Sequence, residues 1–189
     1  MTSIILSDAC ALFMLWVFAQ AGWHKVSKVN EYYYSNLVSQ YFALHQVVND
    51  SLRKEQQLTW IKRLVKFIGV FELGLAFALV IPSTRYFAAL LTVAVLLGYM
   101  SMMAYQLYRG KLDMDCGCGG SAGQLKISSS LLVRNLSFSV LTLLCLSNGQ
   151  SEFSSLTVIT FVVALIAILL NSIIEQLIAN DQQLRLLKN

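Results

Sequence analysis

Five apolar runs separated by polar segments dominate the pattern of the chain. A transmembrane helix needs about 20 mostly apolar residues, and each run reaches or approaches that length. The runs cover residues 4–22, 64–81, 86–108, 131–146 and 156–177. The second run is closed by Pro82, and the short second and fourth runs have ends defined only to within several residues. The pattern predicts an all-α, polytopic membrane bundle of five transmembrane helices.

The polar segment between the first two runs also has helical periodicity. Apolar and aromatic residues recur at spacings of three and four from Tyr34 to Leu52, while Asn36 and Asp50 lie on the opposite face. This pattern predicts an amphipathic helix on the membrane surface, within an insertion at about residues 30–60, with its tyrosines at headgroup depth. A helical hairpin packed on the bundle outside the membrane is the alternative.

Composition supports the membrane class. The chain is 57% hydrophobic and 13% charged, whereas a soluble domain has about 45–50% apolar and about 25% charged residues. The net charge of +4 does not indicate nucleic-acid binding, because the basic residues flank the apolar runs and form no single patch. No Lys or Arg precedes Lys25, so we expect the first run to be a mature helix and not a signal peptide.

The distribution of positive charge predicts the orientation in the membrane. Five crossings place the termini on opposite sides, called X for the N-terminal side and Y for the other. Of the 14 lysines and arginines, Arg85 is expected on X and Arg134 just inside the membrane, which leaves twelve on Y. The positive-inside rule therefore predicts that Y is cytoplasmic and that the N-terminus lies outside.

The segment after the third run carries the most informative residues, Asp113-Met114-Asp115-Cys116-Gly117-Cys118-Gly119-Gly120. A Cys-x-Cys disulfide closes a small, strained ring, and strain suits exchange better than permanent bracing. Metal ligation is the competing chemistry, because adjacent thiolates are also soft-metal ligands. Further thiol or imidazole ligands are not obvious nearby, so redox chemistry is favoured. Two reduced cysteines without a role are the third alternative.

A second set of polar residues falls in the Y halves of the predicted helices: His24, Lys25, Glu72, Arg134 and Asn135. Ionisable groups within a membrane span are costly and usually face a partner or a cavity. Glu72 and Arg134 are predicted to form a charge-assisted pair. The alternative is that Lys25 and Arg134 snorkel to the surface and that Glu72 serves packing alone.

Other polar and thiol groups are weaker candidates. Cys10 and Cys145 both fall in the X leaflet, where a transmembrane thiol relay would need a second pair, but lone cysteines also behave as small buried hydrophobes. Asn171 and Glu175 are expected near the Y surface or packed in the bundle.

Several of these stretches together resemble the methylamine utilisation protein MauE family, which is related to the DoxX-like membrane proteins. The resemblance covers roughly residues 4–147, and its most specific part is Asp115-Cys116-Gly117-Cys118 followed by Arg134-Asn135. Gly119 stands where the family commonly has an aromatic residue. The other matching stretches are residues 18–25, Phe71-Glu72-Leu73, Arg109-Gly110 and Leu132-Val133.

The resemblance implies a four-helix DoxX/MauE-like core over residues 1–147. A fifth transmembrane helix at residues 156–178 and a polar tail at residues 179–189 would follow it. The resemblance also implies an inner-membrane accessory protein. Its role would be to handle thiols or disulfides during the maturation of a periplasmic amine dehydrogenase, whose small subunit is disulfide-rich. A thioredoxin-like partner of the MauD type is implied as well. A periplasmic client would be served most simply by cysteines outside, whereas the charge count places them inside.

Within that interpretation, Cys116 and Cys118 would be the catalytic pair. The supporting polar cluster would be His24, Lys25, Glu72, Arg134 and Asn135. No metal or cofactor is predicted beyond a redox-active disulfide, and whether a quinone takes part stays open. Two other classes also remain open. One is a metal-handling or small-solute transport protein with Glu72 and Arg134 along its path, and the other is a structural subunit of a larger membrane assembly.

Overall fold

A computed structural model of the chain describes most of its helical part. The described residues are 2–27, 30, 33–34, 37–38, 51–110, 126–144, 146 and 156–188. Their main elements are five long helices: α1 (Thr2–Val26), α3 (Ser51–Val80), α4 (Arg85–Tyr108), α5 (Ser129–Leu144) and α6 (Leu156–Lys188).

The predicted class, an all-α polytopic membrane protein, is confirmed. Three helices are long and apolar enough to cross a membrane, over Ile5–Val26, Arg85–Tyr108 and Val158–Leu184. Helix α5 is apolar but has only 16 residues. Helix α3 begins well before the apolar run that predicted it, and helix α6 continues through the predicted polar tail.

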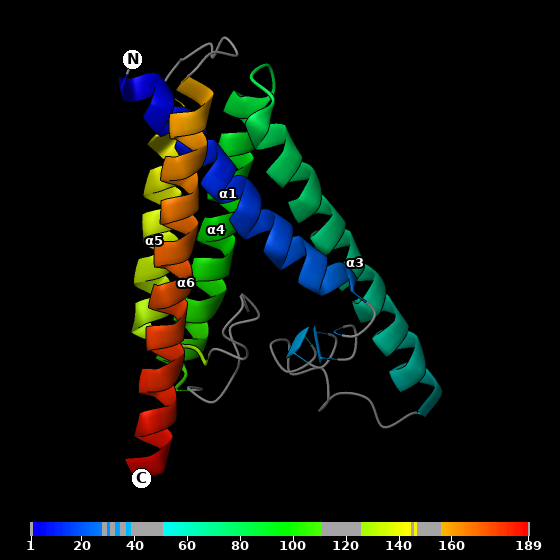
Figure 1. The fold of residues 1–189 in the computed structure, drawn as a ribbon. Coiled ribbons are helices and arrows are strands. Elements are labelled where there is room, and N and C mark those ends of the chain that lie inside the picture. The colour runs from blue at the N-terminus through cyan, green and yellow to red at the C-terminus, as the bar shows by residue number, and fades with distance from the viewer. Residues whose placement is uncertain are drawn as a thin grey trace.

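The helices alternate in direction, so the two ends of the chain lie at opposite ends of the bundle (Figure 1). The axes of α4, α5 and α6 are nearly parallel, and α1 crosses obliquely towards α3. At the X end, Arg85 at the start of α4 forms an ion pair of 2.7 Å with Asp8 of α1. This arrangement is the one expected for five alternating crossings. Which end faces the cytoplasm stays a prediction.

The turn between α3 and α4 shows how a single proline ends a helix. Helix α3 stops at Val80, two residues before Pro82, because proline lacks an N–H and disfavours helical angles in the residue before it. The last carbonyls of α3 then need other donors. The Thr84 hydroxyl donates to the carbonyl of Ala78 at 2.8 Å, and Arg85 Nε donates to that of Leu79 at 3.2 Å.

The main apolar core is built around α1, whose Phe13, Met14 and Phe18 are buried against α3, α4 and α5. Phe13 meets Phe138 of α5 edge to face, with ring centroids 5.6 Å apart. Many large apolar side chains on α3 and α6 instead point outwards, including Phe67, which is 72% exposed. Such a surface suits lipid and not water.

Helices α1 and α3 approach each other closely where glycine faces glycine. A Cβ built on Gly22 would lie 2.6 Å from the carbonyl oxygen of Gly69, and one on Gly69 would lie 2.9 Å from Cβ of Lys25. Small residues let helix backbones approach in this way in membranes. The crossing holds the end of α1, and with it Lys25, directly against α3.

Gly22→Ala is therefore expected to destabilise the protein by about 1–3 kcal/mol, because the added methyl group meets backbone that cannot give way. The matched control is Gly74→Ala in α3, where a Cβ meets nothing within 4 Å. That control should be neutral or stabilising by up to about 1 kcal/mol, the helix-propensity gain. Thermal unfolding in detergent, followed by circular dichroism, measures both. Equal effects of the two variants would contradict the close crossing.

The insertion between α1 and α3 is described only in part. Tyr34 and Leu37 are buried against Ile61 and Val65, where the apolar run of α3 begins. The rest of the predicted amphipathic helix lies outside the described residues, so its position on the membrane surface stays a prediction. The described part packs on α3, near the Y end of α1.

Candidate functional site

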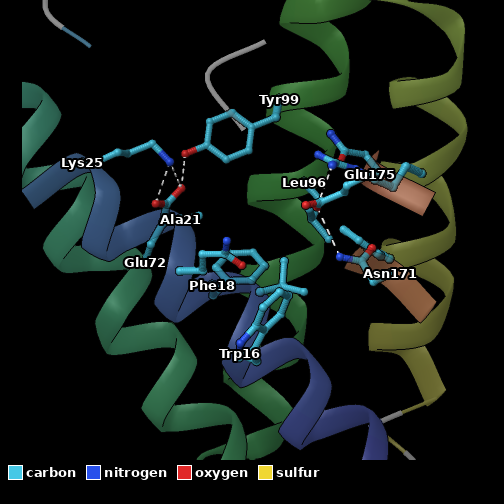
Figure 2. Close-up of a pocket in the computed structure, with 14 residues that line it drawn as sticks. Trp16, Phe18, Ala21, Lys25, Glu72, Leu96, Tyr99, Asn171 and Glu175 are labelled. Atoms are coloured by element: carbon cyan, nitrogen blue, oxygen red, sulfur yellow. Dashed lines mark hydrogen bonds and ion pairs between the residues drawn. The ribbon is translucent and has the colours of Figure 1, made fainter. Parts of the chain in front are cut away.

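A small polar cavity lies inside the bundle and is lined by all five helices (Figure 2). Its volume is about 50 Å³, room for about three to five water molecules at about 10–15 Å³ each. Phe18, Leu96 and Phe138 form part of its apolar wall. Its polar lining consists of Gln20, Lys25, Glu72, Tyr99, Arg134, Asn135, Asn171 and Glu175.

One side of the cavity is a buried ion pair between α1 and α3. Lys25 Nζ donates to Glu72 Oε1 at 2.8 Å and to Oε2 at 2.7 Å. The hydroxyl of Tyr99, on α4, donates to the same carboxylate, and Lys25 Nζ lies 5.3 Å from the centroid of the Tyr99 ring. Glu72 is 1% exposed. One carboxylate therefore ties three helices together.

A second ion pair, between α5 and α6, forms the other side. Arg134 Nη1 donates to Glu175 Oε1 at 2.9 Å, and Asn171 Nδ2 donates to the same oxygen at 3.2 Å. The Arg134 guanidinium also lies over the ring of Phe138, with Cζ 5.6 Å from the centroid. Both ion pairs line the cavity, and Figure 2 shows Lys25 and Glu72 on one side with Glu175 and Asn171 on the other. Two cations and two anions balance there.

The predicted pairing of Glu72 with Arg134 is wrong. Glu72 pairs with Lys25 instead, because the glycine contact between α1 and α3 holds these two side chains together. Arg134 turns towards α6 and pairs with Glu175. The alternative of snorkelling is also wrong for Lys25 and Arg134, since each is 8% exposed and paired inside the bundle. Glu72 and Arg134 still line the same cavity.

The structure brings four of the five predicted supporting residues to this cavity, namely Lys25, Glu72, Arg134 and Asn135. His24 is not among its lining residues and instead makes a hydrogen bond with Asn30, with Nδ2 and Nδ1 3.1 Å apart.

Four further polar residues of the cavity lining received no role from the sequence: Gln20, Tyr99, Asn171 and Glu175. Asn171 and Glu175 stand four residues apart in the last apolar run, which places them on one helix face. That spacing was the signal for a polar face directed into the bundle. Tyr99 had no such signal, because a tyrosine within a membrane span also packs as an apolar residue.

Three buried polar atoms at the cavity have no hydrogen-bond partner within the part of the chain that the structure describes. They are Arg134 Nε, Asn135 Nδ2 and Glu175 Oε2, two donors and one acceptor. A buried polar group left unpaired costs about 1–3 kcal/mol. A bound molecule that both accepts and donates hydrogen bonds would remove that cost, and water or a small polar group fits the volume.

Tyr99→Phe is expected to destabilise the protein by about 1–3 kcal/mol, because the ring stays while the buried Glu72 carboxylate loses a donor. Tyr105→Phe is the control, since Tyr105 lies on the same helix with 52% of its side chain exposed. Thermal unfolding in detergent compares the two. If Tyr105→Phe lowered the stability as much as Tyr99→Phe, the role given to the Tyr99 hydroxyl would be contradicted.

The predicted catalytic cysteines, Cys116 and Cys118, lie outside the described residues, as does Cys145. The structure does define both ends of the segment that carries the pair. Helix α4 closes at its Y end with Gly110, at φ 72°, a left-handed angle suited to glycine. The chain is described again at Lys126, whose backbone exchanges hydrogen bonds of 3.0 and 2.9 Å with the Gln182 amide of α6.

The remaining cysteine, Cys10, is buried on α1 beside Ala11 and Leu141. Among the described residues, no three His, Cys, Asp or Glu side chains come together as a metal site would require. The described part of the chain thus offers ion pairs and hydrogen-bonding groups as its chemistry.

Comparison with protein families matches residues 3–148 to the methylamine utilisation protein MauE. The chain belongs to the MauE family. No curated protein and no solved structure matches it. The MauE match contains α1, α3, α4 and α5 and ends before α6. Arg134 thus lies within the MauE region, while its partner Glu175 comes from a helix beyond it.

Proposed function

We propose that this MauE-family protein is a membrane accessory protein that handles thiol–disulfide exchange through Cys116 and Cys118. The client would be a secreted or periplasmic protein of the amine-dehydrogenase type. The observation that carries the proposal is the family match, which runs through the Cys-x-Cys segment. The family's description as a methylamine utilisation protein supports that client. A thioredoxin-like partner of the MauD type and a bacterial inner-membrane location belong to the same proposal.

The proposed exchange follows ordinary thiol chemistry. The thiolate of one cysteine attacks a disulfide of the partner and forms a mixed disulfide, releasing one partner thiolate. The second cysteine then attacks the mixed disulfide and releases the other partner thiolate. The partner gains two electrons and leaves as a dithiol, while Cys116 and Cys118 become a disulfide. The reverse sequence oxidises the partner. Ring strain in a Cys-x-Cys disulfide favours that oxidising direction.

The two described ends of the Cys-x-Cys segment, Gly110 and Lys126, lie at the Y end of the bundle and support the proposal. The segment leaves α4 at Gly110 and is tied at Lys126 to α6, so its two ends are held by these two helices. Lys111 and Lys126 flank it with positive charge, which favours thiolate over thiol, while Asp113 and Asp115 oppose it. The Arg134–Glu175 ion pair at the cavity joins α5 and α6. Lys126, where the segment ends, lies just before α5.

Trapping of the mixed disulfide tests the proposal. With Cys118→Ser, a partner attached to Cys116 cannot be released, so a reductant-sensitive adduct should accumulate on non-reducing gels. Cys10→Ser on top of that variant should leave the adduct in place, since Cys10 is buried in the core. The test uses cells that also produce a MauD-type partner and the client. If neither Cys116→Ser nor Cys118→Ser gave an adduct in these cells, thiol exchange would be contradicted.

Labelling with a membrane-impermeant maleimide tests the orientation. We expect Cys116 and Cys118 to react only after spheroplasts are permeabilised, because the charge count places Y in the cytoplasm. Reaction in intact spheroplasts would reverse the orientation and would place the pair on the side of a periplasmic client.

Small-solute transport is the second candidate, and the two opposed ion pairs around an internal cavity favour it. The two candidates separate by variant. A transporter would tolerate Cys116→Ser with Cys118→Ser and would lose function when the cavity is altered, for example by Asn135→Leu. A thiol-exchange protein would show the opposite sensitivity.

A further inference from the structure

A second, larger hollow lies beside the polar cavity. It is an apolar groove of about 650 Å³, and α1, α5 and α6 all contribute to its walls. It extends from Leu6, near the X end of α1, to Ile178 in the Y half of α6. Small-molecule and cofactor sites commonly measure about 300–1,000 Å³, so the groove has the size of a ligand site.

Three residues belong to both the groove and the polar cavity: Arg134, Phe138 and Asn171. Arg134 is 8% exposed and its Nε finds no acceptor among the described residues. The groove therefore combines a long apolar wall with a buried hydrogen-bond donor at one place along it. The ring of Phe138 lies beside Arg134, and Phe13 packs edge to face on Phe138 in the same groove.

The polar part of the groove lies deep in the membrane. Asn171 stands at the middle of the apolar span Val158–Leu184, and Arg134 reaches Glu175 one turn further along α6. At 1.5 Å per residue, Asn171 lies about 20 Å along α6 from either end of that span, so these polar groups lie within the apolar span and away from its ends. A charged phospholipid headgroup cannot accompany its chain to that depth without a high desolvation cost.

We propose that this groove binds a lipid-soluble quinone. The isoprenoid tail would lie along α1, α5 and α6, and a ring carbonyl would accept a hydrogen bond from Arg134. A quinone is neutral, carries hydrogen-bond acceptors on a flat ring and has a long apolar tail. Those three properties match a deep donor, two neighbouring aromatic rings and an apolar groove.

The inference deepens the proposed function, and the link to it rests on that function. Forming a disulfide from two thiols releases two electrons and two protons, and reducing a quinone to a quinol takes up the same number. A bound quinone is therefore a matched oxidant for the Cys116 and Cys118 dithiol. The binding itself depends only on the groove, so it can be tested apart from the cysteines.

Fluorescence quenching of Trp16 provides the test, because Trp16 lines the cavity next to the groove. The other two tryptophans of the chain, Trp23 and Trp60, are 68% and 66% exposed and can be replaced by phenylalanine. The full chain in nanodiscs is then titrated with a ubiquinone carrying two isoprene units. We expect saturable quenching, and it should persist when Cys116 and Cys118 are both serine.

Two variants and one control decide the site. Ala167→Phe fills the groove and should weaken binding by about tenfold or more. Val162→Phe adds the same ring to the lipid-facing surface of α6 outside the groove and should leave binding unchanged. Arg134→Lys keeps the charge beside Glu175, removes the Nε–H and adds no apolar volume. It should also weaken binding about tenfold, and it keeps the test open if Ala167→Phe does not fold.

Three results would overturn the proposal. Quenching that rises linearly with quinone, equally in Ala167→Phe and Val162→Phe, would show partition into the bilayer only. The titration is also carried out in detergent, with phosphatidylglycerol added at the same concentration as the quinone. Loss of quenching there would show that a phospholipid occupies the groove. Absence of quenching at any concentration would contradict quinone binding as well.

Discussion

Glu72→Gln is expected to destabilise the protein by about 3–5 kcal/mol, the usual cost of removing one partner of a buried ion pair. The Lys25 ammonium, 8% exposed, would keep its charge and lose the carboxylate that accepts from it at 2.7 and 2.8 Å. Tyr99 would lose its acceptor as well. Unfolding in mixed detergent and SDS micelles, together with the yield of folded protein, measures the effect.

Arg63→Gln is the matched control, because Arg63 lies on the same helix and is exposed. It should change the free energy of unfolding by less than about 0.5 kcal/mol. Lys25→Met combined with Glu72→Leu should recover much of the loss, since a buried ion pair can often be replaced by apolar residues at little cost. An effect of Glu72→Gln no larger than that of Arg63→Gln would contradict the pairing.

Cys116→Ser and Cys118→Ser are each expected to abolish maturation of the client while the bundle stays folded. Each serine variant retains only half of a dithiol, and neither thiol exchange nor disulfide formation within the pair can be completed. The fold should persist because the apolar core and the ion pairs that join the described helices are made by residues of those helices. The measurement is the amount of active, correctly disulfide-bonded client in cells producing each variant.

Two cysteines outside the proposed centre provide the controls for that experiment. Cys10→Ser and Cys145→Ser should leave client maturation near the wild-type level, since Cys10 packs as a buried residue beside Ala11 and Leu141. If Cys10→Ser or Cys145→Ser abolished maturation as completely, a thiol relay across the membrane would replace a single redox pair.

Hydrophobic patterning was enough to predict where the helices lie, because a lipid environment demands long apolar segments. The run at residues 86–108 corresponds closely to α4, and Pro82 correctly ended the second run. Patterning missed most of the extra length of α3, because the first dozen residues of this helix are mostly polar. It also missed that residues 179–188 are helical. Charged and amide residues form a helix as readily as an irregular tail, so their polarity alone does not distinguish the two.

The ion pairs could be predicted in depth but not in partner. Position along a helix gives the depth of Glu72 and Arg134, and both do line one cavity. Which cation meets which anion depends on how the helices adjoin. Here the Gly22–Gly69 contact decides it for Lys25 and Glu72. A glycine in each of two predicted helices does not by itself reveal that they face each other.

The most direct test of thiol–disulfide function is the redox state of Cys116 and Cys118 in intact membranes. Membranes are alkylated with a mass-tagged maleimide, with and without prior reduction, from cells that produce the Cys10→Ser, Cys145→Ser variant so that only this pair reports. Thiol exchange predicts that a fraction of the protein gains two tags only after reduction, and that this fraction changes when the MauD-type partner or the client is removed. A pair that is fully tagged without reduction under every condition, in a protein whose double serine variant still supports maturation, would contradict it.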